Sequence, residues 1–143
     1  MDISEIKKVD AYLKRLFDNA RIRVVPHGTK DSAEVRIGDQ AIGALTADDE
    51  DGDRSYNFRM EIALSQSPKE DTARLVTHLR GTLGSEKIRV MPRARKNDSL
   101  EVYVGDEFVG VLFIDEKKSS RSAILEMAIL DVDLEQDSEV SSL

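Results

Sequence analysis

Four residues of this sequence could take part in acid–base chemistry, two histidines and two aspartates. His27 and His78 stand outside any catalytic motif, and the sequence contains no cysteine, no Gly-x-Ser-x-Gly elbow and no phosphate-binding loop. Asp39 and Asp106 could form a pair of general acids or bases. Each of them follows a glycine, however, and a Gly-Asp pair is also what a tight hairpin turn requires. We therefore predict no enzymatic activity, no catalytic residue and no cofactor.

The acidic stretch Asp48–Asp53 could attract Ca²⁺, which takes oxygen ligands. If Gly52 occupies the sixth position of an EF-hand loop, Ala47 falls at the first position and Phe58 at the twelfth, where the pattern needs carboxylates. The lack of cysteine also excludes a thiolate zinc site. We predict a solvated loop at this stretch and no metal site.

The densest basic cluster of the chain consists of Lys87, Arg89, Arg93, Arg95 and Lys96. Such a cluster could contact the phosphates of a nucleic acid. The chain has a net charge of −7, and no aromatic residue is interleaved with the cluster for base stacking. Solubilising charge on an exposed strand edge is the simpler explanation. Nucleic-acid binding through these five residues is kept as the alternative function.

The elements that would position these residues come from an internal repeat. The stretch SAEVRIGDQAIGAL at 32–45 returns as SLEVYVGDEFVGVL at 99–112, and Ile22–Pro26 returns as Ile88–Pro92. Hydrophobic periodicity predicts one helix and four strands in each copy. The first repeat, 1–66, contains a helix at 3–18 and strands at 22–26, 33–37, 41–46 and 55–64, with a long loop at 47–54. The second repeat, 67–134, contains a helix at 68–83 and strands at 88–92, 100–104, 108–114 and 122–130, and residues 135–143 form an acidic tail.

Each predicted helix begins with a capping signal. Asp2 is suited to the N-cap of the first helix, with Glu5 at the third helical position. Ser67 and Glu70 repeat this capping box before the second helix, with Pro68 at the first helical position.

The fold class predicted from this order is α+β. Two tandem αββββ repeats would form antiparallel meander sheets, each with one helix on a face. A single repeat of this size is marginally stable by itself, and no disulfide can assist it. We therefore expect the two repeats to pack together with pseudo-twofold symmetry.

The strand at 108–114 is apolar on both faces, unlike its counterpart in the first repeat. One face would meet the helix of its own repeat. The other face, with Val109, Val111 and Phe113 and with Met91 and Leu130 in phase, would pack against the other repeat or a second subunit, or would be a recognition surface.

Two pairs of arginines recur at equivalent places, Arg23 with Arg89 and Arg54 with Arg121. They could bind an acidic or phosphorylated peptide through bidentate hydrogen bonds. The commoner arrangement in a sheet is cross-strand pairing, here with Glu34 and Glu101 on neighbouring strands.

The sequence resembles a small alphaproteobacterial family that is one of the numbered domains of unknown function. The resemblance rests on the opening MDISEIKKVDAYLKRLFDNARIRVVP, on SLEVYVGDEFVGVLFIDE, and on DDEDGDRS followed by a Met-Ala-Ile-Leu-type strand. It implies two fused copies of a domain of about seventy residues and brings no activity. The second repeat departs from the pattern, because Asp115–Ser120 replaces Asp48–Asp53, which argues against a duplicated metal site.

We predict a non-enzymatic protein–protein interaction module that acts as an adaptor, accessory or regulatory subunit. The residues assigned to protein binding are Val109, Val111, Phe113, Arg54 and Arg121. No apolar run approaches the ~20 residues that span a bilayer, and the charged N-terminal stretch lacks the core of a signal peptide. We expect a cytoplasmic bacterial protein, a monomer or homodimer, with a partner protein that the sequence does not identify.

Overall fold

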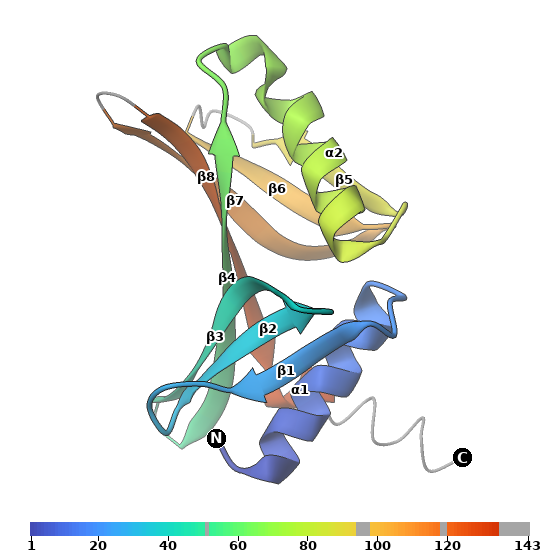
Figure 1. Ribbon diagram of the computed structural model, residues 1–143, viewed down its shortest axis with the longest axis vertical. Helices are drawn as coiled ribbons and strands as arrows, with labels where there is room; N and C mark the ends of the chain where they lie inside the picture. The colour runs from blue at the N-terminus through green and yellow to red at the C-terminus, as the bar shows by residue number, and fades with distance from the viewer. Residues whose placement is uncertain (51, 94–97, 118–119, 135–143) are drawn as a thin grey trace. The chain divides into compact units, whose positions relative to one another are not determined.

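The computed structural model describes residues 1–50, 52–93, 98–117 and 120–134. The first repeat contains α1 (Ile3–Leu16), β1 (Ile22–Pro26), β2 (Ser32–Ile37), β3 (Gln40–Glu50) and β4 (Asp53–Leu64). The second contains the 3-10 helix η1 (Pro68–Glu70), α2 (Asp71–Leu83), β5 (Ile88–Pro92), β6 (Ser99–Val104), β7 (Glu107–Lys117) and β8 (Ser120–Leu130). The fold is α+β with an eight-stranded antiparallel sheet in the order β1-β2-β3-β4-β8-β7-β6-β5 (Figure 1).

The chain forms two compact units whose limits differ from those of the repeats. Unit 1 comprises Met1–Phe58 and Ala128–Leu143, and unit 2 comprises Arg59–Met127. The difference arises because β4 and β8 each begin in one unit and end in the other. The pseudo-twofold packing of the repeats stays a prediction.

Helix α1 has the predicted start. Asp2 Oδ1 accepts a hydrogen bond from the Glu5 N–H (2.8 Å), and Glu5 Oε1 accepts one from the Asp2 N–H (3.0 Å), which confirms the capping box. The helix ends at Leu16, earlier than predicted, because Phe17 is its C-cap and Asp18 takes a positive φ of 49°. Its buried face contacts β1 (Figure 1).

The predicted capping box of the second helix is wrong. Residues 68–70 form a 3-10 turn, α2 begins only at Asp71, and the Ser67 side chain makes no capping bond. The Ser67 N–H, which a capping box would direct to Glu70, instead donates to Ser65 Oγ (3.3 Å), and Ser65 Oγ donates to the carboxylate of Glu70 (3.3 Å). The helix ends as expected at Gly84, which takes the left-handed conformation, and it packs against β5 (Figure 1).

The predicted loop at 47–54 is largely strand. Strand β3 runs to Glu50 and β4 begins at Asp53, and the β7–β8 hairpin is similarly longer than predicted. In the second hairpin the pairing continues through Glu116 opposite Arg121. Oppositely charged residues that face each other across two strands stabilise the pairing. Polar residues can therefore extend a hairpin in a stretch whose composition predicts a loop.

The Gly-Asp turns are confirmed in both repeats. Gly38 and Gly105 have φ values of 60° and 61°, the left-handed region that favours glycine. Both repeats also share an irregular register in the strand just before this turn, between Val35 and Arg36 and between Val102 and Tyr103.

The core of each unit includes side chains from both repeats. In unit 1, Ile129 and Leu134 from the second repeat are buried together with residues of the first. In unit 2, Met60 and Ile62 from the first repeat are buried with residues of the second. Neither repeat therefore carries a complete core.

We expect the fragment 1–66 to fold only as an assembly, either with itself or with the fragment 67–143, because a monomer would leave the unit 1 core incomplete and Met60 and Ile62 exposed. Sedimentation and thermal unfolding of each fragment and of their mixture measure this. A monomeric fragment 1–66 with a cooperative unfolding transition would contradict it.

Candidate functional site

A partly buried arginine of unit 1 is surrounded by carboxylates from three other parts of the chain. Arg54, at the start of β4, donates from Nε to Glu5 Oε2 (2.7 Å) and from Nη1 to Asp49 Oδ2 (3.0 Å). Its Nη2 donates to Asp31 Oδ1 (3.0 Å). Tyr56 Oη donates to Glu5 Oε2 at 2.7 Å. The guanidinium therefore has all three of its nitrogens engaged inside the unit.

The equivalent arginine of unit 2 makes the same kind of cluster. Arg121, on β8, binds Asp71 in bidentate fashion, with Nη2 to Oδ2 at 2.7 Å and Nη1 to Oδ1 at 3.0 Å. Its Nη1 also donates to the Ser65 carbonyl (2.7 Å), and its Nε donates to Glu116 (3.2 Å). The hydrogen bond to Asp71 raises the pKa of Arg121 despite the desolvation that opposes it.

Both clusters attach the first turn of a helix to a strand. Glu5 and Asp71 lie in the first turns of α1 and α2, where the helix dipole also favours a carboxylate. These carboxylates and backbone groups already occupy Arg54 and Arg121, and protein binding through the two arginines stays a prediction. The contacts hold each helix in place.

The predicted cross-strand pairing of the arginines with Glu34 and Glu101 is wrong. Glu34 pairs with Arg36 on its own strand, and Glu101 accepts a hydrogen bond from Tyr103 Oη (3.1 Å). These partners lie two residues away on the same face of the strand, so they are closer than any arginine on the neighbouring strand.

The other recurring arginines bind turn carbonyls. Arg23 Nη2 donates to the Gly38 carbonyl (3.4 Å), and Arg89 Nε and Nη2 donate to the Gly105 carbonyl (3.0 and 2.8 Å). They therefore fasten the edge strands β1 and β5 to the hairpin turns.

The electrostatics of the Arg54 cluster shift the pKa of Glu5, Tyr56 and Asp31. Burial alone would raise the pKa of Glu5, but hydrogen bonds from Arg54, Tyr56 and the Asp2 N–H outweigh it and lower the pKa from 4.5 to about 2. Burial, followed by the hydrogen bond to Glu5, raises the pKa of Tyr56. Hydrogen bonds from Arg54 and the terminal amine lower the pKa of Asp31.

This cluster predicts a pH dependence of stability. Because the pKa of folded Glu5 lies below its ordinary value, ionised Glu5 stabilises the fold above pH 4.5, and that contribution is lost as the pH falls toward 2. The substitution Glu5→Gln should lower the free energy of unfolding by about 1–3 kcal/mol at neutral pH and by much less near pH 2, where Glu5 becomes protonated. Denaturant titrations across this range, with Asp106→Asn as an exposed control, measure the difference. A loss for Glu5→Gln that is independent of pH would contradict the assignment.

The basic cluster is only partly described by the structure. Arg93 Nη1 donates to Ser99 Oγ (3.2 Å), Arg89 is held at its turn, and Lys87 is exposed. Arg95 and Lys96 lie outside the described residues. Nucleic-acid binding through this cluster remains a prediction.

Sequence reasoning missed an aromatic pair beside Arg89. The guanidinium carbon of Arg89 lies 5.3 Å from the Tyr103 ring centroid, and Tyr103 meets Phe108 edge to face with centroids 5.7 Å apart. The signal was present in the sequence, since a two-residue Gly-Asp turn places Tyr103 and Phe108 nearly opposite each other.

Three large apolar side chains are exposed on one strand face of unit 2. We define the outer face of unit 2 as the side of its sheet that bears Met91, Tyr103, Phe108, Val111, Phe113 and Ile124. Met91, Phe108 and Phe113 are 43%, 51% and 41% exposed. Leu112 and Leu125, paired with each other on the opposite side, are fully buried.

Two residues assigned to this surface from the sequence do not belong to it. Val109 is only 8% exposed, because the irregular register between Val102 and Tyr103 takes it out of the alternation of the strand. Leu130 lies in unit 1. Val111 is half-buried and Phe113 is exposed, as the apolar pattern suggested.

The equivalent face of unit 1 has smaller side chains at these positions. Val25, Ala41, Ala44 and Thr46 stand at the positions of Met91, Phe108, Val111 and Phe113 in the repeat. The outer face is therefore a property of the second repeat alone.

The four candidate acid–base residues are divided between the two units. Asp39 in unit 1 and Asp106 in unit 2 are exposed at their hairpin turns, and Arg89 lies 3.9 Å from Asp106. His27 Nδ1 lies 3.4 Å from Glu34, and His78 is exposed on α2. Among the residues that the structure describes, no three side chains of His, Asp or Glu are grouped as metal ligands. No helix in the described ranges is long and apolar enough to cross a membrane.

Two segments of the chain match the same protein family. Residues 5–65 and residues 71–133 each match the model of the family described as "protein of unknown function (DUF3126)". This match confirms the tandem duplication inferred from the sequence, and the expected alphaproteobacterial origin stays a prediction. No curated protein and no solved structure matches the chain.

Proposed function

Since the chain belongs to the DUF3126 family of proteins of unknown function, in two tandem copies, we propose that it is a non-enzymatic protein–protein interaction module. It acts as an adaptor, accessory or regulatory subunit, and its recognition surface is the outer face of unit 2. The observation that carries this proposal is the exposure of Met91, Phe108 and Phe113 on one side of a sheet whose other side is a packed core.

The composition of the outer face is that of an interface. Aromatic residues and methionine are enriched where proteins bind one another, and they carry much of the binding energy. Covering apolar surface contributes roughly 25 cal/mol for each Å² removed from water. Three large side chains that are about half exposed therefore favour a bound state over exposure to solvent.

Charged residues of both signs lie among these apolar side chains, because Glu101 is paired between Met91 and Val111 and Glu126 is paired with Val111. Arg59 Nε lies 4.0 Å from Glu126 Oε1, and both side chains remain substantially exposed. Arg89 stands at the end of the face near the Gly-Asp turn. Apolar anchors together with charged groups of both signs would give such a surface both binding energy and selectivity for a partner.

The divergence of the repeats predicts one such site per chain. Both repeats keep the arginine cluster and the hairpin turns, but only the second has large apolar residues on its outer face. The proposal also includes a cytoplasmic location, the absence of a metal or cofactor, and a chain that is monomeric or homodimeric when free.

The test replaces the outer face with the residues of the first repeat. The triple variant Met91→Val, Phe108→Ala, Phe113→Thr carries the residues found at Val25, Ala41 and Thr46. We expect it to recover a specific partner from a native lysate at least about tenfold less than the unchanged chain does, because the anchoring side chains are gone. Mass spectrometry of the bound fraction measures recovery, and circular dichroism and light scattering check folding and self-association.

The control for this test changes the corresponding face of unit 1. Substituting Ala41→Ser and Thr46→Ala should leave recovery of the partner unchanged. Equal recovery with the triple variant and the unchanged chain would overturn the proposal.

The alternative, nucleic-acid binding, is favoured by the aromatic pair beside Arg89. Tyr103 and Phe108 could stack on bases next to Lys87 and Arg93. The protein-binding proposal predicts no saturable binding of a labelled single-stranded oligonucleotide. Saturable binding that falls steeply with salt and is weakened by Phe108→Ala would favour the alternative.

A further inference from the structure

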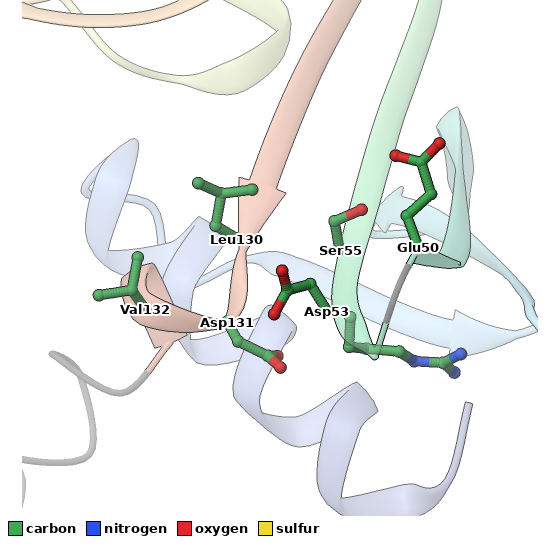
Figure 2. Close-up of a pocket in the computed structure, with 7 residues that line it drawn as sticks. Glu50, Asp53, Ser55, Leu130, Asp131 and Val132 are labelled. Carbon is green, nitrogen blue, oxygen red and sulfur yellow. The ribbon is translucent and has the colours of Figure 1, made fainter.

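Unit 1 has a groove between the tip of the β3–β4 hairpin and the end of β8 (Figure 2). Its volume is about 460 Å³. We call it the acidic groove, and the lining residues that matter here are Glu50, Asp53, Arg54, Leu130, Asp131 and Val132. It lies in the other unit from the outer face, so the inference drawn from it is independent of the proposed function.

The groove has an apolar side and an acidic side. Leu130 and Val132 are 51% and 52% exposed, although both are large aliphatic residues. Figure 2 shows the Asp53 side chain pointing from β4 toward Leu130 and Asp131, with Glu50 on the other side of β4. A ligand in the groove would contact aliphatic carbon and carboxylate oxygen together.

The negative charge of the groove is not compensated by its only lining cation. All three nitrogens of Arg54 are already used by Glu5, Asp31 and Asp49. Within the described part of the chain, Glu50, Asp53 and Asp131 have no ion-pair partner. Three carboxylates that share a groove attract a positively charged ligand.

The corresponding hairpin of the second repeat lacks the carboxylates of Glu50 and Asp53. Lys117 and Ser120 stand in the repeat where the first has Glu50 and Asp53. The arginine is kept, because it holds the helix, but the acidic residues around the groove are not. The groove is therefore a feature of unit 1, to which both repeats contribute, rather than a requirement of the fold.

We propose that the acidic groove binds a basic and apolar segment of a partner protein. A lysine or arginine side chain lies between Asp53 and Asp131, and a neighbouring apolar side chain covers Leu130 and Val132. A metal ion would satisfy only the acidic side, and the described residues contain no group of three metal-ligating side chains. A polypeptide segment is the occupant that satisfies both sides at once.

The experiment uses the full chain and two synthetic peptides labelled with fluorescein. The probe is Gly-Arg-Leu-Arg-Leu-Gly, and the charge-reversed control is Gly-Glu-Leu-Glu-Leu-Gly. Fluorescence anisotropy should show saturable binding of the probe alone. Binding of both peptides with the same affinity, or of neither, would overturn the proposal.

Variants then separate the groove from the general negative charge of the protein. The double variant Asp53→Asn, Asp131→Asn should bind the probe at least about tenfold more weakly, because both carboxylates that hold the cation are lost. The double variant Asp39→Asn, Asp106→Asn removes the same charge from exposed turns and should change the affinity by less than about twofold. An equal effect of the two double variants would contradict a specific site.

The apolar side is tested in the same assay. Leu130→Ser with Val132→Ser should weaken probe binding by about fivefold or more, since the covered aliphatic surface is lost. Unchanged affinity would mean that charge alone holds the peptide and would overturn the assignment of the groove. Thermal unfolding of each variant checks that unit 1 remains folded.

Discussion

A guanidinium that is partly or wholly buried needs a full set of acceptors, and in this protein that requirement fixes how each helix meets its strands. Arg54 on β4 and Arg121 on β8 stand at equivalent places in the two repeats and bind carboxylates in the first turns of α1 and α2. Removing one partner would leave the other buried without compensation, which costs more than an ordinary surface contact. The two clusters therefore belong to the framework, and the surfaces around them are free to differ.

Much of the framework could be predicted from the sequence because its signals are local. The repeat, the Gly-Asp turns and the capping box of α1 depend on residues a few positions apart. The partners of Arg54 could not be predicted, because Glu5 had already been explained as a cap and nothing local relates it to a residue 49 positions later. The passage of β4 and β8 from one unit into the other leaves no local pattern either.

In the candidate sites, too, local patterns could be predicted from the sequence and distant or irregular features could not. The apolar pattern of β7 placed Val111 and Phe113 at an exposed face, but it misplaced Val109, because a change of register is invisible to strict alternation. The acidic groove was missed for another reason. Its carboxylates looked like a solvated loop, and its apolar side comes from the far end of the chain. In both cases the two repeats have the same order of helix and strands and differ in the side chains on their surfaces.

Hydrogen–deuterium exchange of the full chain with and without a captured partner tests the central claim most directly, because it reports on every element at once. The account predicts that protection on binding is concentrated in β7 and the adjoining parts of β5 and β6, with no change in the first turns of α1 and α2. Protection centred on the helix starts and the Arg54 and Arg121 clusters, with β7 unaffected, would contradict it.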